Sequence, residues 1–242
     1  MGMRLLGPVY LIGGQDFHSV YLDWPANDSN VYLIDTGDDL VMVDCGCGES
    51  LENILSNVEE MGFELKDLTH LLLTHEHFPH AGAAQALEKM DVEVVCSESA
   101  AQAIQTGGLR TAAYHYNRPF LPCGECTVVS DGEVISLGRL EITAKSLPGH
   151  SQGSMGYQFF ASDRKMLFSG DVVRSPELTT HRDRVGYDHY LYLLSLKKLL
   201  EDPPHVLYPG HGPFCLSRAD VWIQSELKKL LADGAAKGLG SV

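Results

Sequence analysis

Three histidines lie within six residues in the stretch Thr74-His75-Glu76-His77-Phe78-Pro79-His80. Imidazole is the commonest metal ligand among side chains, and such a cluster suits zinc, iron, manganese or nickel. The apolar run at residues 70–73 predicts a buried strand before the cluster, and residues 81–87 predict the beginning of a helix after it. A turn between a strand and a helix lies at a sheet edge, open to substrate. The pattern therefore predicts a metal-binding loop, with a solvated histidine-rich turn as the alternative.

Three further turns each carry one metal-type residue beside a glycine. They are Gly149-His150, Gly170-Asp171 and Gly210-His211, and each follows an apolar run. A glycine beside a ligand lets the backbone bend sharply and approach an ion closely. One such pair is typical of an ordinary turn, but these turns in one order, together with the histidine cluster, are a much more specific pattern.

The elements that must position these turns can be predicted from periodicity and turn residues. Runs rich in β-branched and aromatic residues predict antiparallel strands near the N-terminus, followed by alternating strands and helices. A helix over residues 187–200 should place its apolar side chains in the core. Strands are expected at 9–12, 19–22, 30–34, 39–44, 92–96, 127–129, 133–136, 140–144, 156–160 and 165–168, and helices at 50–61, from the histidine loop to about 90, and near 99–105.

Residues 106–122 are the least regular part of the chain. Glycines and prolines interrupt this segment, and tyrosines, a histidine and a phenylalanine give it aromatic bulk. This composition predicts a mobile lid or a wall of the substrate pocket. The alternative is a surface loop that is packed by its own aromatic side chains.

Length and charge exclude several classes of protein. The chain has 242 residues, 44% of them hydrophobic, and a net charge of −14. One domain over residues 1–242 can bury a sizeable core, whereas the charge argues against nucleic-acid partners and anionic membrane surfaces. No apolar run approaches the ~20 residues of a spanning helix, and the N-terminus does not resemble a secretory signal. We therefore expect a cytoplasmic protein that acts on a small molecule.

Six cysteines are present, and Cys123 and Cys126 have C-x2-C spacing. A chain of this length without a secretory signal is expected to keep its thiols reduced. A structural zinc needs four ligands, and no second pair lies at the usual spacing. We expect ordinary thiols, with a metal or redox role for Cys123 and Cys126 as the alternative.

The order of the metal-type turns resembles the metallo-β-lactamase superfamily of hydrolases. Members of that family carry H-x-H-x-D-H, then a Gly-His, a Gly-Asp and a final Gly-His. The resemblance covers nearly the whole chain, from residues 30–34 through Val43-Asp44-Cys45-Gly46 to residues 209–212. It implies an α+β fold, the four-layer αββα sandwich, in which two mixed sheets lie face to face with helices outside.

The resemblance also implies a role for each matching residue. The family's first metal would be held by three imidazoles, its second by two, and a carboxylate would bridge the ions. One further acid, Asp44, would orient a ligand without binding metal. The implied ligands are His75, His77 and His150 for the first ion, His80 and His211 for the second, and Asp171 as the bridge.

Pro79 departs from the family motif, because it stands where the motif has Asp. In the family that Asp binds the second metal and is often drawn as the acid that protonates the leaving group. Proline offers no ligand, whereas the first site loses nothing. We therefore expect one tight zinc ion and a second site that is weak or absent, with iron or manganese as alternative metals. Proline itself suits the first position of a helix.

The implied mechanism is attack by a metal-bound hydroxide, because a metal lowers the pKa of its bound water from about 15.7 to about 7. Asp171 would hold that water and accept its proton. Protonation of the leaving group needs a donor other than position 79, and by type the candidates are His181, Tyr187 and His189.

Three arginines lie between residues 174 and 184 of this acidic chain, next to Asp171. Arginine suits a carboxylate or phosphate, so Arg174 and Arg182 are candidates to bind an anionic group of the substrate. The alternative is that these arginines pair with Glu177 and Asp183 at the surface.

Two classes of function follow. The first is a metal-dependent hydrolase of an ester, lactone or thioester, similar in size to acyl-homoserine lactonases and to short glyoxalase-II-like hydrolases. The lactonases have a tyrosine three residues after the bridging Asp, where this chain has Arg174, which argues against a true lactonase. The second class is a mononuclear iron oxygenase of a thiol or persulfide, or a binding protein with reduced activity. Many relatives are dimers, so the resemblance also allows a homodimer.

Overall fold

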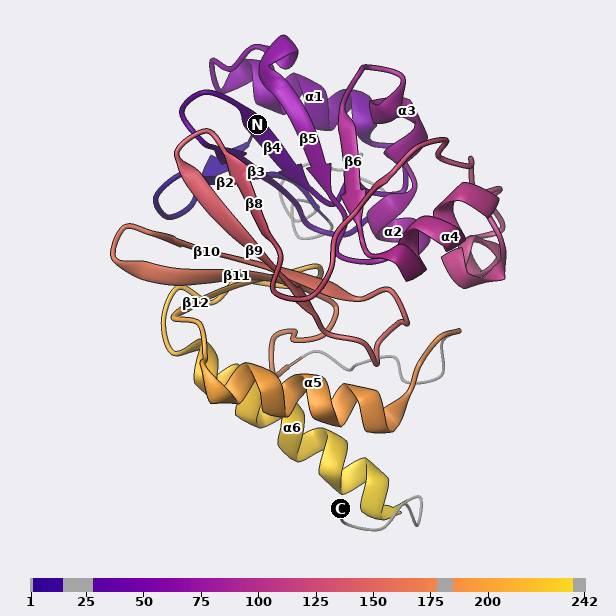
Figure 1. The fold of residues 1–242 in the computed structure, drawn as a ribbon, viewed down its shortest axis with the longest axis vertical. Coiled ribbons are helices and arrows are strands. Elements are labelled where there is room, and N and C mark those ends of the chain that lie inside the picture. Colours follow the sequence, from indigo (N-terminus) through magenta and orange to yellow (C-terminus); the bar gives the residue numbers. More distant parts are fainter. Residues whose placement is uncertain (1, 15–27, 178–184, 237–242) are drawn as a thin grey trace.

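Two β-sheets face each other, and helices cover the outer face of each in the computed structural model (Figure 1). The structure describes residues 2–14, 28–177 and 185–236. The four layers are those of the αββα sandwich, so the predicted α+β fold is confirmed.

The first sheet contains the N-terminal half of the chain, with its strands in sequence order from β1 to β7. Strands β1 to β4 pair antiparallel, whereas β4 to β7 pair parallel. Its strands are β1 (Met3–Arg4), β2 (Val9–Gly13), β3 (Val31–Asp35), β4 (Leu40–Val43), β5 (Leu68–Leu72), β6 (Glu93–Cys96) and β7 (Thr127–Val128).

The second sheet contains the C-terminal half, in the order β12-β11-β10-β9-β8. All neighbours pair antiparallel except β11 and β12, which pair parallel. Its strands are β8 (Val134–Leu137), β9 (Leu140–Ser146), β10 (Met155–Ala161), β11 (Arg164–Gly170) and β12 (Val206–Pro209).

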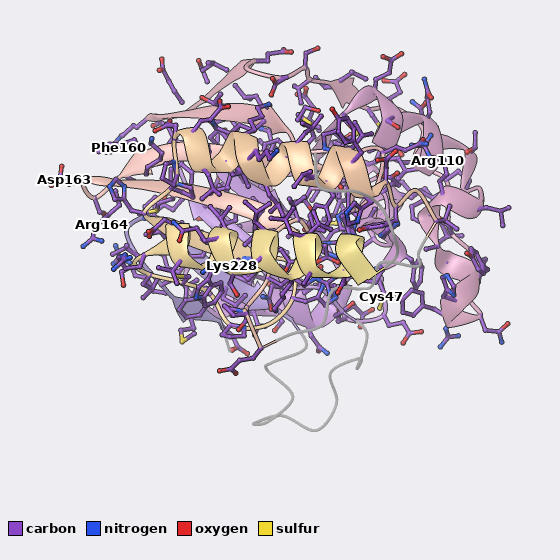
Figure 2. All side chains as sticks on the ribbon, turned by 90° about the horizontal axis from the view of Figure 1, so that it is seen from below. Cys47, Arg110, Phe160, Asp163, Arg164 and Lys228 are labelled. Atoms are coloured by element: carbon purple, nitrogen blue, oxygen red, sulfur yellow. The ribbon has the colours of Figure 1, made fainter. Side chains whose placement is uncertain are left out.

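The helices divide between the two outer layers. Helices α1 to α4 lie along the first sheet, and α5 and α6 lie side by side along the second (Figures 1 and 2). The α-helices are α1 (Leu51–Glu60), α2 (Phe78–Ala81), α3 (Ala84–Glu88), α4 (Glu98–Thr106), α5 (His189–Glu201) and α6 (Ala219–Ala236), and the 3-10 helices are η2 (Leu65–Asp67), η3 (Leu109–Thr111) and η4 (Ala113–Tyr116). None of these helices is both long and apolar enough to cross a membrane.

Three apolar clusters fill the spaces between the layers. Alternating side chains of β4 show how one strand serves two of them: Met42 packs toward α1, whereas Val41 and Val43 pack between the sheets. The third cluster joins β11 and β12 to α5 and α6. This alternation is the period-2 pattern of a strand that is buried on both faces.

Some element predictions need correction. The helix expected to run to about residue 90 is divided into α2 and α3 around Gly82, where the chain packs closely: a Cβ at Gly82 would lie 2.6 Å from the Cys47 carbonyl oxygen. On α5, Tyr190, Leu191 and Leu194 are 53%, 36% and 42% exposed, because only one face of the helix packs on the sheet and α6. Helix α6 was not anticipated, and the strand expected at residues 19–22 lies outside the described residues.

Strand register brings the metal-type turns together at one end of the sheets. In the first sheet Val43 pairs with Leu72, so the residues after β4 and β5 emerge side by side. In the second sheet Gly170 pairs with Pro209, so Asp171 and the turn after β12 do the same. The site therefore forms where the ends of parallel strands meet, as expected for an edge that is open to ligands.

Candidate metal centre

The six predicted metal ligands converge although they come from four segments. His75 and His77 follow β5, and His80 belongs to α2. His150 lies in the turn between β9 and β10, Asp171 follows β11, and His211 follows β12. Every one of them except His211 is at most 2% exposed, and the His211 side chain is 16% exposed. The structure therefore brings all six candidate ligands together.

Two groups of described residues have potential ligand atoms that all lie within 4.8 Å of one another. One group is His75, His77 and His150, and the other is His75, His80 and Asp171. The first is the predicted ligand set of one ion. The second differs from the prediction for a second ion, because it contains His75 in place of His211.

Hydrogen bonds from behind orient two of the three imidazoles of the first group, those of His75 and His77. The Nδ1 atom of His75 lies 3.1 Å from Thr74 Oγ1, and the Nε2 atom of His77 lies 3.3 Å from the Val185 carbonyl oxygen. On the inner side, His150 Nε2 and His77 Nδ1 are 3.2 Å apart. His75 Nε2 and His150 Nδ1 are buried without a hydrogen-bond partner among the described residues. Partners behind a ligand fix which nitrogen faces the ion. The inward nitrogens therefore fit a divalent cation.

Burial keeps these imidazoles neutral. It lowers the pKa of His77 to about 4, and it holds the pKa values of His75 and His150 well below their usual range. The neighbouring imidazoles add to this effect for His75, because a charge on one disfavours a charge on the next. Only the neutral imidazole can ligate a metal, so the first group is ready to bind at neutral pH.

Asp171 lies at the centre of the second group, with both carboxylate oxygens engaged. Its Oδ1 atom is 2.8 Å from His211 Nδ1, and Oδ2 accepts a hydrogen bond from Arg174 Nη2. Burial alone would raise the pKa of Asp171, but Arg174, His211 and His80 outweigh it and hold the pKa well below its usual range. Asp171 is therefore ionised and a weak base.

Asp44 lies behind His80 rather than among the ligand groups. It follows β4 in the left-handed region, with φ of 57°, and its Oδ2 atom is 2.7 Å from His80 Nδ1. It also accepts hydrogen bonds from the Thr74 amide and hydroxyl, both at 2.8 Å. Burial would lower the pKa of His80, but the carboxylates of Asp171 and Asp44 raise it to about 9. This placement supports the predicted orienting role of Asp44.

Two glycines allow the turns to approach closely. A Cβ at Gly149, whose φ is 132°, would lie 2.3 Å from Tyr192 Cα on α5. A Cβ at Gly210 would lie 2.4 Å from His80 Cε1 and 2.8 Å from Asp171 Oδ1. Both glycines are thus required by close packing, as the sequence pattern indicated.

Glu76 was not predicted to belong to the site, although it stands between two ligands. It is 1% exposed, lies 3.2 Å from Arg110 Nη2, and accepts a 2.8 Å hydrogen bond from the Ser151 hydroxyl. The histidine loop, the turn that carries His150 and residues 106–122 are therefore joined through one buried carboxylate. The unusual position of an acid inside H-x-H was the only signal in the sequence.

Asn30 is a second residue that sequence reasoning missed. Its side-chain amide donates to the carbonyl oxygens of Pro209 at 3.0 Å and Gly212 at 2.8 Å. These bonds hold the turn that carries His211 against β3. Asparagine next to a strand is too common for this role to be predicted.

Residues 106–122 are anchored beside the histidine loop. Phe78 in α2 contacts the rings of Tyr116 and Phe120, with centroids 5.6 Å and 6.3 Å apart. Arg110 holds Glu76 from the same segment, and it lies at the end of the molecule opposite the hairpin marked by Phe160 (Figure 2). The segment packs on the loop as well as on its own aromatics, and its role as a lid or wall remains a prediction.

The other candidate residues have different outcomes. Arg174 is buried against Asp171, which neither reading of the arginine segment anticipated. Tyr187 Oη lies 3.2 Å from His189 Nδ1, and the role of either as a proton donor remains a prediction. His181 and Arg182 lie outside the described residues. The thiols of Cys123 and Cys126 are 4.0 Å apart and belong to neither ligand group of the described residues.

Comparison with known proteins agrees with this geometry. The profile of the metallo-beta-lactamase superfamily matches residues 24–211. A probable metallo-hydrolase of Bacillus subtilis is 30% identical over 76% of this chain and 85% of its own length. A hydroxyacylglutathione hydrolase of Haemophilus influenzae is 27% identical over 78% and 82%, and a human acyl-coenzyme A thioesterase is 30% identical over 76% and 73%.

Solved structures show the same fold. A B3 metallo-beta-lactamase with an active-site glutamic acid superposes with a TM-score of 0.77 at 24% identity, covering 99% of this chain and 92% of that one. This likeness concerns the architecture alone. Together with the profile match and the sequence relatives, it shows that the chain belongs to the metallo-β-lactamase superfamily of hydrolases.

Proposed function

We propose that this chain is a zinc-dependent hydrolase of thioesters. The observation that carries the proposal is the convergence of three buried, neutral imidazoles, His75, His77 and His150, beside the ionised carboxylate of Asp171. Three imidazoles with an open fourth position are a donor set that suits catalytic zinc. When bound there, zinc would polarise a carbonyl group and acidify a water molecule.

The choice of a thioester rests on the leaving group. Position 79 offers no acid, and Asp171 is already bonded to His211 and Arg174. A thiolate leaves without a proton at neutral pH, since thiols have a pKa of about 8.5, whereas an alkoxide must be protonated as it leaves. Two of the similar proteins, the hydroxyacylglutathione hydrolase and the acyl-coenzyme A thioesterase, are named for thioester substrates.

The residues of the chain divide the remaining work. Thr74 and the Val185 carbonyl orient His75 and His77 from behind. Asp171 contributes a fixed negative charge at the centre of the site, and its low pKa keeps that charge at any physiological pH. Its proposed part in accepting a proton from water would require that one of its present partners moves away.

We also propose that the protein works in a reducing compartment on a small-molecule substrate. All six cysteines are free thiols, which supports a reducing compartment such as the cytoplasm. The net charge of −14 supports a small-molecule substrate over a nucleic acid.

The proposal is tested with matched substrates. The same acyl group should be offered as a coenzyme A or glutathione thioester, as an oxygen ester and as a lactone, and release of thiol or acid should be followed with zinc-loaded protein. We expect kcat/KM for the thioester to exceed that for the oxygen ester by at least about tenfold, because only the ester needs a proton donor.

His75→Ala is the control that links activity to the metal centre, and it should abolish turnover of every substrate. Hydrolysis of esters or lactones without thioester cleavage would contradict the choice of substrate. Oxygen uptake that requires iron and a thiol, without hydrolysis, would contradict the reaction class and favour an oxygenase.

A further inference from the structure

A permanent cation lies where a second metal ion would need Asp171. We propose that the guanidinium of Arg174 takes the place of that ion, so that the protein binds one divalent cation, at His75, His77 and His150. The inference rests on the metal centre of the proposed function, and it goes further by assigning Arg174 a role in setting how many ions the centre holds.

The contacts of Asp171 leave neither carboxylate oxygen available to a second ion. A bridging carboxylate must offer one oxygen to each ion, but here Oδ1 contacts His211 Nδ1 at 2.8 Å and Oδ2 contacts Arg174 Nη2. Arg174 is 6% exposed, so its guanidinium is enclosed with the carboxylate instead of extending into solvent. The protein itself has filled the coordination positions that a second cation would use.

The net charge around Asp171 also disfavours a second ion. Relative to the H-x-H-x-D-H motif, Pro79 removes one negative charge and Arg174 adds one positive charge beside Asp171. The region around Asp171 therefore differs by two unit charges from a site built for a second dication. Buried charges are weakly screened, so a change of this size opposes binding of a second ion strongly.

Close packing also restricts His80 and Asp171, two of the groups that would ligate a second ion. The backbone at Gly210 approaches both His80 and Asp171 so closely that a Cβ there would overlap His80 Cε1 at 2.4 Å. His80 is also held from behind, by Asp44 at 2.7 Å. The groups that would ligate a second ion are thus packed against the chain, although His80 Nε2, like His75 Nε2 in the first group, has no hydrogen-bond partner among the described residues.

Arg174 is a positioning residue in this view. Arginine stays protonated at every accessible pH and cannot be removed by a chelator, unlike a metal ion. It would hold Asp171 in place in the metal-free protein as well as in the loaded one. The Nε atom of Arg174 is buried and has no hydrogen-bond partner in the described part of the chain, so the guanidinium is not saturated by its protein partners.

The test counts bound ions and does not use turnover. Metal-free protein is titrated with zinc or cobalt, and bound metal per chain is measured by equilibrium dialysis and elemental analysis. We expect saturation at one equivalent in the unmodified protein, even in large excess of metal. Two equivalents would overturn this inference alone, whereas no bound metal would overturn the proposed function with it.

Substitutions then separate Arg174 from Pro79. The variant Pro79→Asp restores the missing ligand but keeps the guanidinium, so it should still bind one ion tightly. Adding Arg174→Met should increase the affinity for a second equivalent by at least about 100-fold relative to Pro79→Asp alone, because a positive charge within a few Å is removed. Equal second-ion affinity in these two variants would show that Arg174 plays no part.

Two further variants control for folding and for charge. Arg174→Lys keeps the positive charge and should keep the stoichiometry at one. Arg110→Met removes a partly buried arginine that pairs with a different carboxylate, that of Glu76, and should also leave the stoichiometry at one. Circular dichroism of each variant shows whether it folds, and a second ion bound by Pro79→Asp/Arg110→Met but not by Pro79→Asp would contradict the specific role of Arg174.

Discussion

The two halves of the metal centre are built on opposite principles. His75, His77 and His150 are neutral, and hydrogen bonds from behind orient His75 and His77. Asp171, Arg174 and His80 are charged, and the Asp171 carboxylate is already paired within the chain, with His211 on one oxygen and Arg174 on the other. Both halves are buried at the same sheet edge, so burial alone does not decide which binds a metal.

The difference shows what makes buried polar groups a ligand site. A buried imidazole nitrogen whose lone pair lacks a partner costs free energy, and a cation can recover it. A buried carboxylate that is paired with a guanidinium has no such deficit, and breaking the pair would leave a charge uncompensated. His80 Nε2 in the second half also lacks a partner among the described residues, but its pKa of about 9 keeps the ring protonated. The first half is therefore the half that gains from an ion.

Mutation of one histidine in each half should give the greatest difference in metal content and activity. His77→Ala should lose the metal and lower kcat/KM by at least about 1,000-fold, because it removes a ligand of the first half. His211→Ala should retain one equivalent of metal and lose only about tenfold, because it removes a partner of Asp171. Elemental analysis measures the metal content, and thioester hydrolysis measures the activity. Equal metal loss in the two variants would show that the two halves form one site.

Asp44→Asn tests how firmly the second half is held. Asp44 is 2% exposed and accepts three hydrogen bonds, two from Thr74 and one from His80. An amide cannot accept at both of its positions, so the free energy of unfolding should fall by about 2–4 kcal/mol. Chemical denaturation measures this change in the metal-free protein.

Asp202→Asn is the matched control for Asp44→Asn. Asp202 pairs with Lys165, and its side chain is 63% exposed, so the loss should stay below about 1 kcal/mol. A loss as large as that of Asp44→Asn would mean that burial of the acid is irrelevant.

Glu76→Gln tests the connection between the first half and residues 106–122. The change leaves the Arg110 guanidinium with a weaker partner beside the metal loop, because Glu76 bonds Arg110 and Ser151. We expect a fall of about 1–3 kcal/mol in the free energy of unfolding and retention of one metal ion.

The surface pair of Arg118 and Glu49 is the comparison for Glu76, because its side chains are 57% and 46% exposed. Arg118→Ala should change the free energy of unfolding by less than about 0.5 kcal/mol. Loss of metal from Glu76→Gln would show that the carboxylate acts on the ligands directly, and does more than join the histidine loop to residues 106–122.

The pH dependence of stability in the metal-free protein should show the smallest difference between histidines of the centre. His77 and His211 have pKa values of about 4, so the unfolded chain takes up protons below about pH 6.5 that the folded chain does not. Stability should therefore fall as pH decreases from about 6.5 toward 4, by up to about 1.4 kcal/mol per pH unit for each histidine. His80, with a pKa of about 9, acts in the opposite direction: its contribution is present below about pH 6.5 and is lost as pH rises through 9.

The two effects together predict maximal stability of the metal-free protein near pH 6.5, with a steeper decline on the acid side. Denaturation in the presence of a chelator between pH 4.5 and 9 measures this curve. A curve that keeps rising above pH 7 would mean that His80 is not held as a cation between Asp44 and Asp171.

The sequence predicted the fold and the ligand set better than it predicted the contacts around them. Strands and ligand turns could be predicted because β-branched runs and the glycine next to each ligand have local causes. The pairing of Arg174 with Asp171 was not predicted although the two residues lie three positions apart, because an arginine there also suits a substrate anion or a surface partner. Glu76 was missed because its partners Arg110 and Ser151 are distant in sequence and reach it only through the fold.

The most direct test of this account is anomalous diffraction at the zinc absorption edge, on crystals of the unmodified protein that were grown with excess zinc. We predict one anomalous peak, between His75, His77 and His150, with Arg174 still paired to Asp171. A second peak between His80, Asp171 and His211, with the Arg174 side chain displaced, would contradict it.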